Sequence, residues 1–169
     1  MKPTLYLMLG YPGAGKTTAA RVLAKITGAV HLSSDEFRLQ KYQNPSFDQD
    51  EHDELYSSLN QKTRELLMHG KSVIYDANLN RKEHRQEKYD LAYDLGIPTR
   101  LLWVQAHRHL AKERALTVKD LNLRPFGPMS EHMFERVADV MQEPSGNEPF
   151  VAIDGTMVSP EYIKKTLGL

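Results

Sequence analysis

A glycine-rich stretch near the N-terminus, Gly10-Tyr11-Pro12-Gly13-Ala14-Gly15-Lys16-Thr17-Thr18, has residue types that can bind phosphate. It fits the phosphate-binding loop pattern of Gly, four free positions, then Gly-Lys and Ser or Thr. Glycines let the backbone turn its N–H groups inward, toward anionic oxygens. Lys16 can reach the β- and γ-phosphates, and the Thr17 hydroxyl can bind Mg²⁺. The stretch therefore predicts a site for a nucleoside triphosphate with Mg²⁺, with nucleotide contacts from Gly10, Pro12, Gly13, Ala14, Gly15, Lys16, Thr17 and Thr18.

A carboxylate at Asp76 follows the apolar run Val73-Ile74-Tyr75. The tip of a buried strand beside a phosphate-binding loop is a suitable place for a residue that holds Mg²⁺ or its waters. The alternative is a simple strand-ending turn with Asn78. We favour a metal-binding and substrate-binding role, because the loop already requires a metal partner nearby.

A second carboxylate, Asp35, lies three residues before Arg38 in Ser33-Ser34-Asp35-Glu36-Phe37-Arg38, so the two share a helical face. A carboxylate can accept the proton of an attacking hydroxyl, and an arginine can bind an anionic group of the acceptor. The competing interpretations are a helix cap at Ser34 or Asp35, and an exposed cation or an ion-pair partner at Arg38. Position alone leaves both open.

Three arginines, Arg108, Arg114 and Arg124, lie on or near a segment rich in Asn, Pro and Gly, residues 119–128. Such a segment between two helices is typical of a mobile loop. Phosphoryl transfer spreads negative charge over oxygens, and an arginine on a closing lid can stabilise it. Arg124, next to Pro125, is best placed for that catalytic and nucleotide-binding role.

Apolar strand-like runs alternate with helical patterns along the chain, which indicates an α/β fold with a mainly parallel sheet. The run at 4–9 precedes the glycine-rich loop, and helical spacing of apolar residues follows it until Gly28. Further strands are expected at 29–32, 72–76, 99–104 and 150–154. A parallel sheet binds ligands outside the carboxyl ends of its strands, so the candidate residues gather at one edge.

The length of 169 residues suits one domain over 1–169 with one substantial core. The absence of cysteine excludes disulfides and cysteine-based metal sites. No signal peptide and no membrane-spanning run is evident, so we expect a cytoplasmic protein without membrane contact. A formal net charge of zero argues against bulk electrostatic binding of long nucleic acids, while a local basic groove stays open. Composition does not indicate an oligomeric state.

Several segments together resemble the small P-loop kinases. The likeness rests on Gly10–Thr17, residues 33–38, Val73-Ile74-Tyr75-Asp76-Ala77-Asn78-Leu79-Asn80 with Arg85, Arg124-Pro125, and residues 143–150. It is greatest to the kinase domain of phage polynucleotide 5′-hydroxyl kinase, and more distant to the zeta-toxin and gluconate-kinase groups.

The resemblance implies a three-layer P-loop fold with a five-stranded parallel sheet and a mobile lid. It also implies transfer of the ATP γ-phosphate to a hydroxyl, with Asp35 as base and Lys16 and Arg124 as further catalytic residues. Asp35, Arg38, Asp76, Asn78 and Arg85 would contact the acceptor. The lid is less basic than a nucleic-acid-binding lid would be, so a nucleic-acid 5′ end, a sugar, a nucleoside or an antibiotic all stay open. A nucleotide-binding switch without an acceptor is the alternative outside kinases.

Overall fold

The structure, a computed structural model, describes residues 2–169. Its strands are β1 (Leu5–Leu9), β2 (Val30–Ser33), β3 (Val73–Asp76), β4 (Thr99–Gln105) and β5 (Val151–Asp154). Its helices are α1 (Lys16–Thr27), α2 (Ser34–Lys41), α3 (Gln49–Met68), α4 (Lys82–Asp94), α5 (Arg108–Thr117), α6 (Glu131–Asp139) and α7 (Pro160–Leu167). The strands form one sheet in the order β2-β3-β1-β4-β5, and all neighbouring pairs are parallel. The predicted α/β fold with a five-stranded parallel sheet is therefore confirmed.

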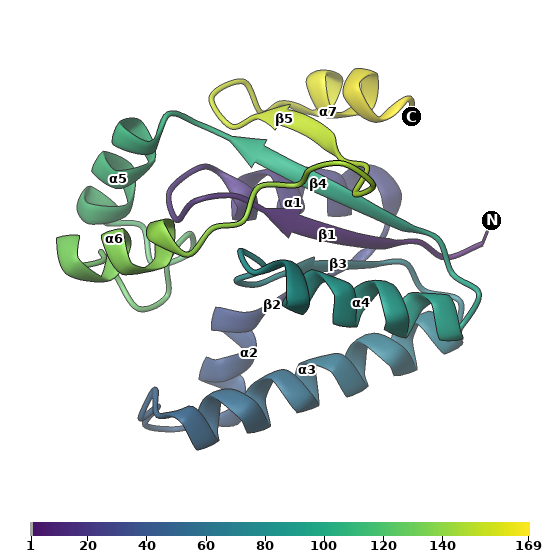
Figure 1. Cartoon of the computed structure of the whole chain (residues 1–169), viewed down its shortest axis with the longest axis horizontal. Helices are drawn as coiled ribbons and strands as arrows, with labels where there is room; N and C mark the ends of the chain where they lie inside the picture. The colour runs from purple at the N-terminus through teal and green to yellow at the C-terminus, as the bar shows by residue number, and fades with distance from the viewer. Residues whose placement is uncertain (1) are drawn as a thin grey trace.

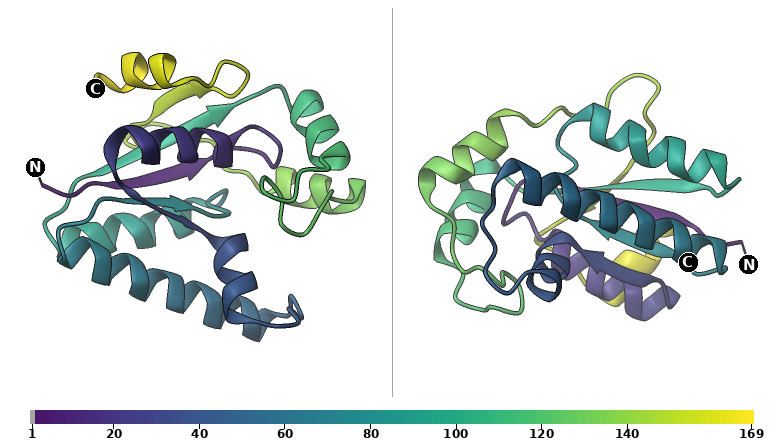
Figure 2. Two further views of the ribbon diagram at one scale, coloured as in Figure 1. Left: turned by 180° about the vertical axis from the view of Figure 1, so that it is seen from behind. Right: turned by 90° about the horizontal axis from the view of Figure 1, so that it is seen from below.

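The side chains of β1 point alternately to the two faces of the sheet, which explains the three layers. Tyr6 and Met8 point into one apolar cluster with α1 and α7, whereas Leu5, Leu7 and Leu9 point into a second cluster with α3 and α4. Figure 1 shows the sheet between these two groups of helices, and Figure 2 shows the same layers from behind and from below. Because β1 is buried on both faces, it is apolar at every position.

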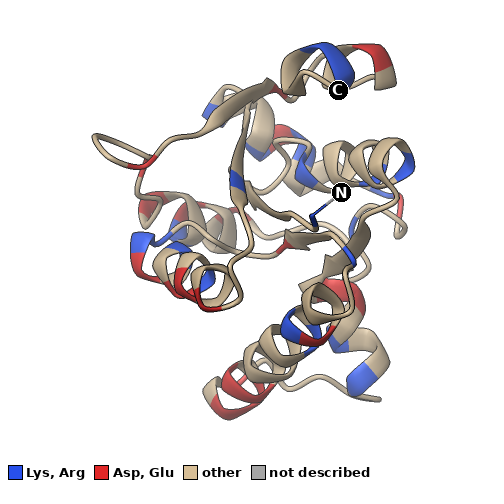
Figure 3. Cartoon of the chain, turned by 90° about the vertical axis from the view of Figure 1, so that its right-hand side faces the viewer, with Lys and Arg blue, Asp and Glu red and all other residues tan. Residues whose placement is uncertain are grey.

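Strand register brings the candidate residues to one edge. Ser33 at the end of β2 pairs with Asp76 at the end of β3, and the loop after β1 lies beside them. Figure 3 shows that basic and acidic residues are mixed over the helices that surround this sheet. The shared edge, rather than one strongly basic face, is what the fold contributes to a site.

Arg85 is a correction to the sequence interpretation, because the structure buries it completely on α4 instead of exposing it to an acceptor. Its Nε and Nη2 each donate to Glu148 at 2.8 Å. Its remaining N–H groups donate to the carbonyls of Leu79, Asn80 and Gln142. All donors of the guanidinium are thus used to join α4 to the segment that precedes β5.

Neutralising Glu148 should destabilise the fold. Glu148→Gln keeps the size of the side chain but leaves the Arg85 charge buried without its carboxylate, which typically costs about 3–5 kcal/mol of unfolding free energy. Urea unfolding followed by circular dichroism measures this loss. The control is Asp94→Asn, whose exposed partner Arg64 is 4.0 Å away, where a change within about 0.5 kcal/mol is expected. Equal unfolding midpoints for the two variants would contradict the anchoring role.

Candidate active site

A pocket of about 660 Å³ opens at the carboxyl edge of the sheet. Its lining comes from the loop after β1, the start of α2, the end of β3, α3 with Phe47 before it, α5 and α6 with the connection between them, and Gly155 after β5. Predicted site residues that line it are Gly10, Pro12, Gly13, Gly15, Lys16, Thr17, Thr18, Asp35, Arg38, Asp76, Asn78 and Arg124. Arg85 does not line it, and the Ala14 side chain is buried in the core instead.

Backbone geometry explains the glycines of the loop. Gly13 has φ of 80° and Gly15 has φ of 109°, where other residues are strained. A Cβ at Gly13 would also collide with the carbonyl oxygen of Ala111, so α5 packs directly on the loop backbone. The helix α1 begins at Lys16, which puts the positive end of its dipole at the loop.

Lys16 lies over this loop and donates to the carbonyls of Gly10 at 2.7 Å and Tyr11 at 3.1 Å. Burial lowers the pKa of Lys16 to about 8, against the opposing effect of the nearby Asp76 carboxylate. A bound polyphosphate would replace neutral carbonyls with anionic oxygens and favour the charged ammonium. Lys16 therefore lies where the loop pattern predicts a contact with phosphate.

The end of β3 offers oxygen ligands that fit Mg²⁺. Thr17 Oγ1 donates to Asp76 Oδ2 at 3.0 Å, and His31 Nε2 lies 2.8 Å from the same carboxylate oxygen. Mg²⁺ prefers such hard oxygens and takes its other ligands from water and substrate phosphates. Within residues 2–169 no group of three or more His, Asp or Glu could hold a metal alone. The donor set thus suits a metal that arrives with a nucleotide.

Asp35 lies on the first turn of α2 but does not cap it. The Ser33 side chain accepts from the Glu36 backbone N–H at 3.4 Å, so the cap interpretation for Ser34 or Asp35 is wrong. No hydrogen bond to the Asp35 carboxylate is found within residues 2–169. Burial raises the pKa of Asp35, and Arg124 opposes that rise. The carboxylate is thus available to accept a proton in the pocket.

Arg38 is buried one turn along α2, with 7% of its surface exposed. Its guanidinium pairs with Glu51 of α3 and lies over the Phe47 ring, 4.7 Å from the centroid. The predicted shared face is confirmed, since Asp35 and Arg38 both line the pocket. The exposed-cation interpretation is wrong.

The segment at 119–128, the expected lid, contributes Leu123 and Arg124 to the pocket. Arg124 Nε donates to the Gly127 carbonyl at 2.9 Å, and burial lowers the pKa of Arg124 while Asp35 opposes this. Arg114 also lines the pocket. Arg108 instead pairs with Glu135 and with Asp139 at 2.6 Å on α6, outside the pocket lining.

A family model described as an AAA domain matches residues 5–144 of this chain. The chain belongs to this family. Its resemblance to the small P-loop kinases is thereby confirmed, and with it an ATP-binding P-loop. No curated protein sequence matches the chain.

Solved structures with this fold include several kinases. A candidate kinase from Chloroflexus aurantiacus superposes with a TM-score of 0.76 at 18% identity, covering 99% of this chain and 98% of that one. A gluconokinase from Sinorhizobium meliloti gives 0.69 at 14% identity, with 99% and 91% covered. A chain of the Pnkp1/Rnl/Hen1 RNA repair complex gives a TM-score of 0.66 at 19% identity. The match covers 82% of the present chain and 44% of that one. At these identities the likeness shows the fold alone.

Several lining residues were missed by sequence reasoning. His52 and Tyr56 lie one helical turn apart on α3, with ring centroids 4.4 Å apart, and Phe47 lies just before that helix. Their four-residue spacing was visible in the sequence, but Leu55 and Leu59 dominated the interpretation of that helix as a core element. His31, which contacts Asp76 but does not line the pocket, was missed as well, because Asp76 lies on a different strand.

Among residues 2–169, no helix is long and apolar enough to cross a membrane.

Removing the Arg124 guanidinium should slow phosphoryl transfer. If Arg124 stabilises the transferring phosphate, Arg124→Ala should lower kcat by a factor on the order of 10³, as for arginine fingers. An ATP analogue should also protect residues 119–128 from protease. The matched control is Arg108→Ala, because that guanidinium pairs with α6 instead of lining the pocket. Normal turnover of Arg124→Ala without nucleotide protection would refute the lid.

Proposed function

We propose that this P-loop protein is an ATP- and Mg²⁺-dependent kinase that transfers the γ-phosphate of ATP to a hydroxyl group. The observation that carries the proposal is the carboxylate of Asp35. It lines the same pocket as the phosphate-binding loop, lacks a hydrogen-bond partner within residues 2–169, and has a pKa raised by burial. A nucleotide site alone has no need of such a base.

In the proposed step, an oxygen lone pair of the acceptor forms a bond to the γ-phosphorus. The bond between that phosphorus and the bridging oxygen breaks, and its electron pair leaves with ADP. The hydroxyl proton passes to Asp35, whose raised pKa makes it a better acceptor. Lys16 and Arg124 offset the negative charge on the transferring group.

Thr17 and Asp76 would hold Mg²⁺ in this reaction. When bound, the ion neutralises charge on the β- and γ-phosphate oxygens. His31 supports the arrangement, because its contact with Oδ2 fixes the orientation of the Asp76 carboxylate.

The acceptor class stays open at this level. Structures of similar fold include a gluconokinase and a chain of an RNA repair complex, so a sugar and a nucleic-acid 5′ end both have support by analogy. The resemblance of the sequence to polynucleotide 5′-hydroxyl kinase supports the second, with Arg38 and Asn78 as acceptor contacts, whereas the weakly basic lid supports an acceptor without a polynucleotide chain.

Replacing Asp35 tests the kinase against a nucleotide-binding switch. Asp35→Asn is nearly isosteric, and Ser33 remains to cap α2, so folding should survive. General-base help is worth about 10²–10⁴-fold, and transfer should fall by that factor while ATP affinity is unchanged. Coupled ADP release against 5′-hydroxyl oligonucleotides, nucleosides, sugars and antibiotics measures the effect.

The control is the neighbouring Glu36→Gln, whose side chain pairs with Arg21 at 3.3 Å and does not line the pocket. Turnover should be unchanged in that variant. A switch would instead give equal ATPase rates for wild type and Asp35→Asn, with no acceptor raising ADP release. A large loss of thermal stability in Asp35→Asn would show a structural role.

A further inference from the structure

The wall of the pocket beyond Asp35 is built from a buried ion pair. Arg38 and Glu51 are 7% and 8% exposed, and the guanidinium donates to the carboxylate. The other Glu51 oxygen accepts from the backbone N–H of Ser46 at 2.6 Å and from its hydroxyl at 2.9 Å. The carboxylate therefore has two tasks: it neutralises Arg38 and it fixes the turn that carries Phe47.

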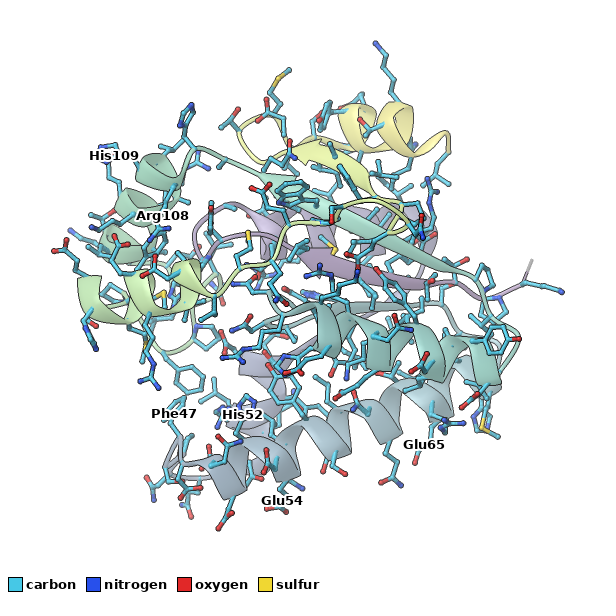
Figure 4. All side chains as sticks on the ribbon, in the orientation of Figure 1. Phe47, His52, Glu54, Glu65, Arg108 and His109 are labelled. Atoms are coloured by element: carbon cyan, nitrogen blue, oxygen red, sulfur yellow. The ribbon has the colours of Figure 1, made fainter. Side chains whose placement is uncertain are left out.

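Three rings form the rest of this wall. Phe47 is 58% exposed, has φ of 57°, and lines the pocket with His52 and Tyr56. Such a backbone conformation is unusual for a bulky residue and is held here by the Glu51 contacts. Figure 4 shows Phe47 and His52 close together at the start of α3, whereas Glu54 on the same helix points away. Arg38 lies over this ring and Phe126 meets it edge-on, so the part of the ring that stays exposed at the mouth of the pocket is the surface left for stacking.

The charges on this wall do not favour an anion. The Arg38 charge is cancelled by Glu51, so Arg38, Glu51 and Asp35 together carry a net negative charge, and the cation that faces Asp35 is Arg124 of the expected lid. Burial and the nearby Arg38 lower the pKa of His52, so its ring is neutral near pH 7. Burial raises the pKa of Tyr56, so its hydroxyl stays protonated. The other lining cations, Lys16, Arg114 and Arg124, lie on the phosphate loop, on α5 and on the expected lid.

We propose that this wall binds a neutral alcohol that carries a flat ring, such as a nucleoside. In this proposal Glu51 determines the specificity by excluding acceptors that carry a phosphate on the same sugar as the reacting hydroxyl. The proposal rests on the proposed kinase function and names its acceptor class. The ring stacks on Phe47, and the Arg38 guanidinium orients the acceptor by donating a hydrogen bond to an uncharged oxygen of it. The phosphate moves to the hydroxyl by the step described above.

Paired acceptors test the role of Glu51. Uridine, thymidine and guanosine are each compared with the corresponding 3′-monophosphate in coupled ADP release, and ribose serves as the acceptor without an aromatic ring. Wild type should prefer the nucleosides in kcat/KM by about tenfold or more, because the Asp35 carboxylate and the phosphate of the monophosphates are both negative and repel each other in a partly buried site. Glu51→Gln should shift that ratio toward the monophosphates by about tenfold, since it frees the Arg38 charge.

The matched control is Glu54→Gln, which removes a charge one turn away on α3 from an exposed pair with Lys41 at 3.4 Å. It should leave the ratio unchanged. If Glu51→Gln has a clearly lower unfolding temperature than wild type, Phe47→Ala provides the second test. Loss of the stacking ring should raise KM for the nucleosides about tenfold with little change in kcat. Tyr93→Ala, which removes an 85% exposed ring outside the pocket, should change neither.

Calorimetric binding of the same acceptors, with a non-hydrolysable ATP analogue present, separates this proposal from the kinase activity. Binding of nucleosides without transfer would refute the kinase and keep the acceptor site. Transfer with a preference for the monophosphates or for a 5′-hydroxyl oligonucleotide would overturn the neutral-acceptor proposal and keep the kinase. Binding of ribose as tight as that of uridine would overturn the stacking role, and so would the absence of nucleoside binding.

Discussion

The site depends on how closely the phosphate-binding loop approaches the backbone behind it. A Cβ at Gly13 would collide with the Ala111 carbonyl of α5, and a Cβ at Gly155 would collide with the Ala14 carbonyl of the loop. The loop backbone therefore lies directly against two other backbone segments, at Ala111 and at Gly155. Because protein interiors do not compress, a methyl group at either glycine would displace the loop. The position of Lys16 and the start of α1 follow from this packing.

The pocket brings together partly buried groups of opposite charge. Burial shifts the pKa values of Lys16, Asp35 and Arg124 toward their neutral forms, and each shift is opposed by a neighbour of opposite sign. Perturbed titratable groups in one cleft are typical of functional sites, although structural ion pairs also perturb pKa values. Here the structural case is Arg85 with Glu148, which lies outside the pocket and uses all its donors internally. The difference between the two cases is the available hydrogen-bonding capacity of Asp35.

The sequence predicted those parts of the site that depend on local pattern. The phosphate-binding loop needs only its own glycines and flanking apolar runs, and parallel pairing then brings Asp35 and Asp76 to its edge. The interpretation of Arg85 was wrong because its partner, Glu148, lies 63 residues away and is joined to it only by the fold. Glu51 was missed for a similar reason, since a glutamate near the start of a helix is ordinary in sequence. Gly155 likewise gives no local signal of its contact with Ala14.

The expected lid contacts the proposed acceptor wall and α1, and the strength of these contacts bears on how the pocket opens. Phe126 meets Phe47 edge-on at 5.1 Å between ring centroids, and Arg21 donates to the Asn122 carbonyl. An aromatic pair contributes about 0.5–1.5 kcal/mol, and an exposed hydrogen bond about as much. A minor conformation that lies only a few kcal/mol above the dominant one is populated at about 0.1–10%. These contacts alone would therefore leave the open arrangement populated. Phe47 belongs to both the lid contact and the proposed acceptor wall, so acceptor binding and lid position depend on the same ring.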